Sequence, residues 1–184
     1  MTTEEQLLRF VPRCPQEERD RREMLSLLRT RPRIYTREDQ EAHFTASAWI
    51  VNAARSRVLL AYHNIFDSWA WTGGHADGEE DLLAVALREA EEETGLRRLC
   101  AVGDAPLSLE ILPVKAHVKR GVPVPAHRHL NLSFLLEAEE DEPLAVKPDE
   151  NSAVAWFDAA EVLSRVSEPE MRPIYEKLLR RQRD

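Results

Sequence analysis

A dense group of carboxylates lies near the middle of the chain. Residues 88–96 read Arg-Glu-Ala-Glu-Glu-Glu-Thr-Gly-Leu, after the loop sequence Gly-His-Ala-Asp-Gly-Glu-Glu of residues 74–80. On a helix with about 100° per residue, Glu89, Glu92 and Glu93 stand at i, i+3 and i+4 and share one face. They repel one another near a helix C-terminus, where the macrodipole also disfavours anions. A hard divalent cation such as Mg²⁺ or Mn²⁺ would reverse both penalties, so the spacing indicates a metal site.

The alternative interpretation of such a run is a solvated acidic helix surface. The surrounding spacing favours the metal site. Starting from Gly74, the sequence reads Gly-x5-Glu-x7-Arg-Glu-Ala-x-Glu-Glu-x-Gly-Leu. This pattern resembles the signature of the Nudix hydrolases, and every charged and glycine position of that signature is filled. The one departure is Ala90, where the family usually has a larger aliphatic residue.

The resemblance implies both a fold and a reaction. The implied fold is an α/β/α sandwich with a mixed sheet over roughly residues 40–170. Nudix enzymes hydrolyse nucleoside diphosphates linked to another moiety, and related phosphoanhydrides, with divalent metal ions and an attacking water. We therefore expect a Nudix pyrophosphohydrolase that uses Mg²⁺ or Mn²⁺ and acts on a small phosphorylated substrate. The motif leaves open whether this is ADP-ribose, a nucleotide sugar, a dinucleoside polyphosphate, a nucleoside triphosphate or a non-nucleotide diphosphate.

The resemblance also implies roles for single residues. Carried over by position, Glu89, Glu92 and Glu93 are the expected metal ligands, and the backbone carbonyl of Gly73 is a further one. The general base differs between subfamilies, so one of these glutamates or an acid from a later loop could serve. Glu150 stands where family members often place that additional acid, and an exposed loop acid is an equally open interpretation.

Two supporting residues and several substrate contacts complete the candidate site. Arg88 can reach Glu92 at i+4 and would orient a motif glutamate, while Glu80 would brace the start of the helix. Aromatic residues near the motif could stack on a base or simply fill the core: Phe66, Trp69 and Trp71. Four basic residues could contact phosphates: His75, His127, Arg128 and His129. Alternation along a strand places Arg128 on the opposite face from His127 and His129.

The elements that must position these residues follow from periodicity and turn residues. We predict a hairpin of strands 44–51 and 57–62, a short strand 69–72, a helix from about Glu79 to Gly95, strands 107–112, 114–118, 127–136 and 154–157, a proline-rich loop 119–125, and helices 158–166 and 169–181. Helices on both faces of a mixed sheet would bury the apolar sides of these elements. Pattern and resemblance thus predict the same α/β class.

The length of 184 residues, with 43% hydrophobic residues, suits one sizeable core. We expect residues 1–40 to form an N-terminal helical extension and residues 41–184 the Nudix domain. The extension could pack on the core, contribute to a homodimer interface, or cover part of the cleft.

Composition also excludes several classes of function. The net charge of −8 argues against long nucleic acid or an anionic membrane as the main partner. No apolar run approaches the roughly 18 residues of a membrane span, and the first residues lack a signal-peptide pattern, so we expect a cytoplasmic protein. Cys14 and Cys100 have neither the number nor the spacing of a disulfide framework or a zinc site.

Two rival functions share the predicted fold. A Nudix-like module could sense a nucleotide without turnover, but such modules commonly lose motif glutamates and this chain retains them. Isopentenyl-diphosphate isomerases also bind metal and diphosphate, but they require a cysteine on a strand before the helix. No cysteine occurs between Cys14 and Cys100, so the hydrolase is preferred.

Overall fold

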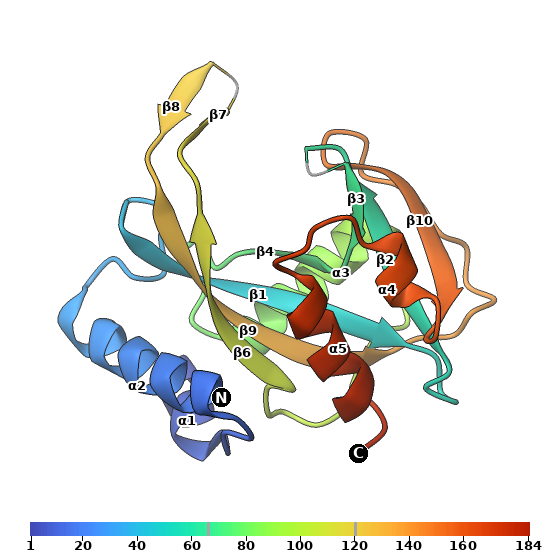
Figure 1. The fold of residues 1–184 in the computed structure, drawn as a ribbon, viewed down its shortest axis with the longest axis horizontal. Helices are drawn as coiled ribbons and strands as arrows, with labels where there is room; N and C mark the ends of the chain where they lie inside the picture. Colours follow the sequence, from blue (N-terminus) through green and yellow to red (C-terminus); the bar gives the residue numbers. More distant parts are fainter. Residues whose placement is uncertain (66, 120) are drawn as a thin grey trace.

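A mixed eight-stranded sheet forms the centre of the molecule, as seen in a computed structural model that describes residues 1–65, 67–119 and 121–184 (Figure 1). Its strands are β1 (Ala42–Val51), β2 (Arg57–His63), β3 (Ser68–Ala70), β4 (Thr72–His75), β5 (Cys100–Ala101), β6 (Ser108–Val114), β9 (His127–Glu137) and β10 (Asn151–Asp158). A separate hairpin consists of β7 (His117–Lys119) and β8 (Val122–Val124). The helices are α1 (Thr3–Arg9), α2 (Pro15–Thr30), α3 (Leu82–Thr94), α4 (Val162–Arg165) and α5 (Arg172–Arg181).

The sheet is organised around β1 and β9, which run parallel from the pair Ala42 and Arg128 to the pair Val51 and Glu137. The main strand order is β10-β2-β1-β9-β5, with β3, β4 and β6 paired onto β2, β1 and β9. All pairs other than β1 with β9 are antiparallel, including the predicted hairpin of β1 and β2. The prediction of a mixed sheet is confirmed.

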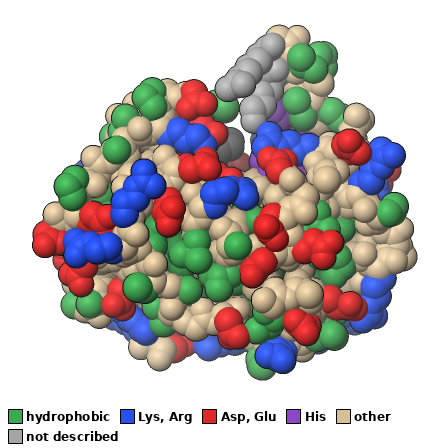
Figure 2. Space-filling view, turned by 180° about the vertical axis from the view of Figure 1, so that it is seen from behind, with side chains coloured by type: hydrophobic (Ala, Val, Ile, Leu, Met, Phe, Trp, Pro, Cys, Tyr) green, Lys and Arg blue, Asp and Glu red, His purple; other side chains and the backbone are tan. Residues whose placement is uncertain are grey.

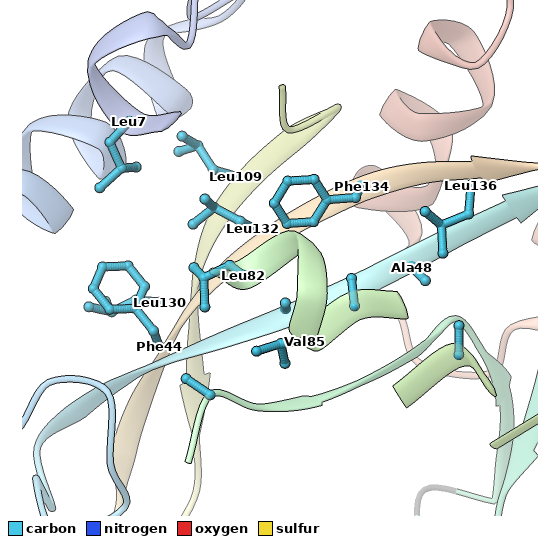
Figure 3. Close-up of a cluster of buried hydrophobic side chains, with 14 of the residues drawn as sticks. Leu7, Phe44, Ala48, Leu82, Val85, Leu109, Leu130, Leu132, Phe134 and Leu136 are labelled. Carbon is cyan, nitrogen blue, oxygen red and sulfur yellow. The ribbon is translucent and has the colours of Figure 1, made fainter. Parts of the chain in front are cut away.

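Alternate residues of β1 serve two different cores. Phe44 and Ala48 lie with Leu82 and Val85 of α3 in the cluster shown in Figure 3, whereas Trp49 packs with α5 on the other face. This division follows from the two-residue period of a strand. The predicted α/β/α sandwich is therefore confirmed.

The N-terminal helices pack on this core beside β6 (Figure 1). Leu7 of α1 and Met24 of α2 are fully buried in the same cluster as Phe44. The Thr3 hydroxyl donates a hydrogen bond of 2.7 Å to the backbone oxygen of Glu80, just before α3. The extension thus contacts the segment that leads into the candidate site.

The central helix α3 begins three residues later than predicted. Asp81 is its N-cap, and its carboxylate accepts from the amides of Leu83 and Ala84 at 3.1 and 3.4 Å. An N-cap residue satisfies amides that have no partner within the helix, so the helix starts after it. The predicted end is confirmed, because Gly95 follows the helix in a left-handed conformation with φ of 77°.

Three later elements also differ from the predictions. β6 continues through Pro113, where we had predicted a break, because a proline is tolerated on a strand at the edge of a sheet. The predicted loop 119–125 contains β8, which pairs with β7. Helix α4 begins at Val162, not at Asp158, because β10 extends through Asp158. None of the helices in the described residues has the length and apolar character needed to span a membrane.

Candidate active site

Glu93 links the last turn of α3 to β4. Its side chain is buried, and its Oε1 accepts a hydrogen bond of 2.8 Å from the amide of Gly73. The side-chain amide of Asn151 in β10 donates to the backbone oxygen of Glu93 at 3.0 Å. Burial raises the pKa of Glu93 to about 8 against the effect of the Gly73 amide, and the charges of Glu150 and Glu89 raise it further. A counter-ion near Glu93 would favour its charged form.

Three carboxylates converge at this place. One oxygen from each of Glu89, Glu93 and Glu150 lies within 4.8 Å of the others. Glu150 comes from the turn before β10, and its backbone oxygen accepts from the amide of Asn64 at 3.0 Å. An all-oxygen set with one buried, protonation-prone member suits a hard divalent cation and is costly without one. The donor atoms therefore fit the metal that the resemblance implies.

Glu92 lies beside this group and not within it. Its carboxylate is half exposed and accepts from Nζ of Lys147 at 2.9 Å, and the same Nζ lies 3.1 Å from Oε2 of Glu150. The structure thus groups Glu150, rather than Glu92, with Glu89 and Glu93. Sequence analysis missed Lys147, whose only local signal is its i,i+3 spacing to Glu150.

Arg88 orients a motif glutamate, although a different one from the predicted partner. Its Nη2 donates to Oε1 of Glu89 at 2.9 Å and to the backbone oxygen of His75 at 3.2 Å. Its Nε lies 4.0 Å from the Glu92 carboxylate, at the limit of an ion pair. Glu80 contributes its backbone oxygen to Thr3, while the Glu80 side chain is exposed.

The two glycines of β4 allow close approach of two different elements, α3 at Gly74 and β1 at Gly73. A Cβ on Gly74 would lie 2.5 Å from Oε1 of Glu89. A Cβ on Gly73 would lie 2.5 Å from the backbone oxygen of Ala46 and 2.8 Å from Cα of Ser47. Gly73 therefore needs to be glycine, whereas a Cβ at Gly74 would displace the Glu89 carboxylate. The contact observed for Gly73 is made by its amide, and the predicted role of its carbonyl as a metal ligand stays a prediction.

A histidine cluster occupies the ends of three strands next to this site. The structure brings together His75, His127 and His129, and it adds His43, which sequence analysis missed. The ring centroid of His43 lies 5.1 Å from that of His75, 4.9 Å from that of His127 and 5.1 Å from that of His129. Burial and the neighbouring histidines lower the pKa of His129 to about 2, so this ring is neutral at physiological pH.

The other candidates for substrate contact lie elsewhere. Arg128 leaves the histidine cluster and pairs with Glu23 of α2, as its position in the strand predicted. Trp69 and Trp71 pack against Phe157 and Tyr175 with ring centroids 4.7 and 5.3 Å apart, so both fill a core. Phe66 lies outside the described residues. Acidic and basic side chains are interspersed over the face shown in Figure 2.

The family model of the NUDIX domain matches residues 41–181 of the chain. The chain belongs to the Nudix family. The match includes the site glutamates, both β4 glycines and all four clustered histidines.

Two curated proteins that are similar in sequence to this Nudix chain are named as hydrolases. It is 43% identical over 68 residues to the CMP-5′-(N-acetyl-N-hydroxy-3-aminopropyl)phosphonate hydrolase of Streptomyces rubellomurinus, covering 33% of each protein. It is 35% identical over 122 residues to the m7GpppN-mRNA hydrolase NUDT17 of Xenopus laevis, covering 60% of this chain and 40% of that protein. The aligned part therefore spans well under half the length of these relatives.

Solved Nudix-type structures have the same fold. The Escherichia coli dihydroneopterin triphosphate pyrophosphohydrolase superposes with a TM-score of 0.58 at 17% identity, covering 74% of this chain and 94% of that one. The Caenorhabditis elegans Ap4A hydrolase in its binary complex gives a TM-score of 0.51 at 21% identity, covering 73% and 93%. At these identities the likeness establishes the fold alone.

Proposed function

We propose that the chain is a metal-dependent Nudix pyrophosphohydrolase that cleaves a phosphoanhydride bond in a small phosphorylated compound. The observation that carries the proposal is the convergence of oxygens from Glu89, Glu93 and Glu150 within 4.8 Å of one another. A phosphoanhydride carries several negative oxygens, so an anionic site can bind it only through an intervening cation. Family membership and donor chemistry support the same reaction class.

The proposed ligands of Mg²⁺ or Mn²⁺ are Glu89, Glu92 and Glu93, with the carbonyl of Gly73 as a further oxygen. When bound, such an ion neutralises phosphate charge and lowers the pKa of an attacking water. Glu92 now shares the ammonium of Lys147 with Glu150, so these two carboxylates already bind one positive charge between them. The position of Glu92 in the Nudix motif supports its inclusion in the ligand set.

The remaining residues position the ligands and move a proton. The Gly73 amide holds Glu93, and the guanidinium of Arg88 holds Glu89. Glu150 is the proposed general base, because its side chain is 41% exposed and can take a proton from a water beside the buried carboxylates. Lys147 stands where it can pair with a phosphate oxygen once Glu92 binds the metal.

For the substrate we propose a nucleoside diphosphate linked to another moiety. Both curated relatives carry a nucleotide in their names, a CMP conjugate and a capped mRNA. The net charge of −8 favours a small substrate over long RNA. A non-hydrolytic nucleotide sensor is the second candidate, supported by the ammonium of Lys147 that already satisfies two site carboxylates.

A substrate panel tests the proposal. The panel contains ADP-ribose, a nucleotide sugar, a dinucleoside polyphosphate, a nucleoside triphosphate, a capped dinucleotide and a non-nucleotide diphosphate, each with Mg²⁺, with Mn²⁺ or with excess EDTA. We expect metal-dependent release of a nucleoside monophosphate from at least one linked diphosphate. Binding of nucleotides without any turnover would support the sensor, and equal turnover in EDTA would contradict the metal requirement.

We also propose the division of the chain into an N-terminal helical extension, residues 1–40, and a Nudix domain, residues 41–184. The packing of α1 and α2 on the domain core supports an extension that stabilises the domain. A cytoplasmic location and a homodimer are further proposals, which cell fractionation and sedimentation equilibrium of the full chain would test.

A further inference from the structure

Four histidines from three strands meet at one end of the sheet. The parallel register places His43 of β1 opposite His129 of β9, while His75 lies on β4, whose register places it opposite Thr45. One ring nitrogen from each of His43, His75 and His129 lies within 4.8 Å of the others. The group shares no residue with the carboxylates Glu89, Glu93 and Glu150.

Hydrogen bonds set the tautomers of two of these rings. Nδ1 of His43 lies 3.0 Å from the backbone oxygen of Asp39, so Nδ1 carries the hydrogen and Nε2 of the neutral ring carries a lone pair. Nδ1 of His127 lies 2.9 Å from the backbone oxygen of Pro125, so Nδ1 of His127 also carries a hydrogen. A histidine that ligates a metal typically donates its other nitrogen to a carbonyl in this way.

One ring nitrogen of the cluster is buried without a partner. His43 is 4% exposed, and its Nε2 is buried with no hydrogen-bond partner among the residues that the structure describes. Nε2 of His127 and Nε2 of His129 form a hydrogen bond of 3.1 Å with each other, so one of these two atoms carries the hydrogen. A buried nitrogen lone pair without a partner is costly, and a cation at the centre of the group would satisfy it.

The positive charge that acts on His43 and His129 is partly balanced. It belongs to the guanidinium of Arg37, which is paired with Asp77 through two bonds of 2.8 and 2.6 Å. A phosphate fits less well, because His43 and His127 already donate their Nδ1 hydrogens to backbone oxygens and cannot offer those hydrogens to an anion.

We propose that His43, His75 and His129 form a second metal site, distinct from the carboxylate site, for a borderline transition cation such as Zn²⁺. Imidazole nitrogens suit Zn²⁺, whereas Mg²⁺ prefers oxygens, so the two sites differ in the class of metal they take. Tetrahedral Zn²⁺ with bonds of about 2.0–2.1 Å needs ligand nitrogens about 3.3 Å apart, which small side-chain rotations would achieve here. His127 lies beside these three ligands, with its Nε2 3.1 Å from Nε2 of His129.

A metal at this position would link β1, β4 and β9. Of these strands, β4 carries Gly73 and Gly74. The backbone oxygen of His75 accepts from Arg88, which also donates to Glu89. The bound ion would therefore stabilise the segment on which the carboxylate site is built. This proposal does not depend on hydrolysis, because it concerns binding by a separate set of side chains.

Calorimetric titration of the metal-free full chain with Zn²⁺, in excess Mg²⁺, tests the proposal. We expect one tight Zn²⁺ per chain in the parent, and binding weaker by about tenfold or more in His43→Gln and His129→Gln. Two control variants should bind Zn²⁺ like the parent: His63→Gln, a histidine outside the cluster, and Glu93→Gln, which alters the carboxylate site. Unchanged binding in both cluster variants, or loss in Glu93→Gln alone, would overturn the assignment.

A measurement on the parent chain gives a test that does not depend on whether the variants fold. Nitrogen NMR of the imidazole rings reports which nitrogens bind the metal. We expect the Nε2 resonance of His43 to shift on addition of one equivalent of Zn²⁺, with the ring nitrogens of His63 unmoved. Absence of any shift at His43, His75 and His129 would overturn the proposal whatever the variants do.

Discussion

Replacement of Glu17 by glutamine should reveal how strongly the N-terminal extension is joined to the domain. Glu17 of α2 is fully buried. Its carboxylate accepts from Arg181 of α5 at 2.5 and 2.8 Å, from Lys177 at 3.1 Å and from the amide of Arg13 at 2.9 Å. Burial alone would raise the pKa of Glu17, but the hydrogen bonds from Arg181 and Arg13 and the charge of Lys177 outweigh it and lower the pKa to about 2.

The size of the effect follows from this pKa. A fall from the ordinary value of 4.5 to about 2 corresponds to about 3 kcal/mol of folding stability at neutral pH. Because the folded-state pKa is lowered, this stability is present above pH 4.5 and is lost as the pH falls towards 2. By linkage about 1 kcal/mol is lost at pH 4 and about 2 kcal/mol at pH 3.

Urea unfolding at pH 7, 4 and 3 measures this difference. We expect Glu17→Gln to lower the free energy of unfolding by about 3 kcal/mol at pH 7 and by only about 1 kcal/mol at pH 3. Glu18→Gln is the matched control, because the Glu18 carboxylate is 43% exposed and pairs with surface arginines. A deficit in Glu17→Gln that is the same at pH 7 and pH 3, or no larger than that of Glu18→Gln, would refute the reasoning.

Two further predictions concern the candidate site. In Gly74→Ala the new Cβ would lie 2.5 Å from Oε1 of Glu89. Because the end of the Glu89 side chain can move, the melting temperature should change little, but calorimetry should show Mg²⁺ binding about tenfold weaker. Gly73→Ala would meet the Ala46 backbone and should lose on the order of 3 kcal/mol of stability in urea; equal stability of the two variants would contradict this. Lys147→Met removes the ammonium between Glu92 and Glu150 and should make Mg²⁺ bind several-fold more tightly, whereas unchanged or weaker binding would show that Lys147 does not compete with the ion.

Local signals in the sequence were enough to predict α3 and the strands on either side of it. The end of α3 was predictable, because Gly95 stops the helix through its own left-handed conformation. The start of α3 was wrong because Asp81 caps the helix from outside, whereas the prediction counted it within the first turn.

The composition of the site depends on contacts between distant segments. Glu150 joins Glu89 and Glu93 because Asn64 fixes its backbone and Asn151 bonds to α3, and no local pattern indicates either contact. The histidine cluster likewise requires the parallel register of β1 and β9, which brings His43 to His129. Alternation along β9 predicted which of its side chains share a face, but it could not predict the neighbouring strand.

The central claim is that the buried carboxylate group holds the cation needed for hydrolysis. Its most direct test is the initial rate of phosphoanhydride hydrolysis as a function of Mg²⁺ for the parent, Glu93→Gln and Glu91→Gln, with melting curves for all three. Glu91 stands on the same helix, but it points nearly opposite to the face that carries Glu89 and Glu93. We predict a fall in rate on the order of a hundredfold or more for Glu93→Gln and a parent-like rate for Glu91→Gln. A folded Glu93→Gln with the parent's rate and Mg²⁺ dependence would contradict the claim.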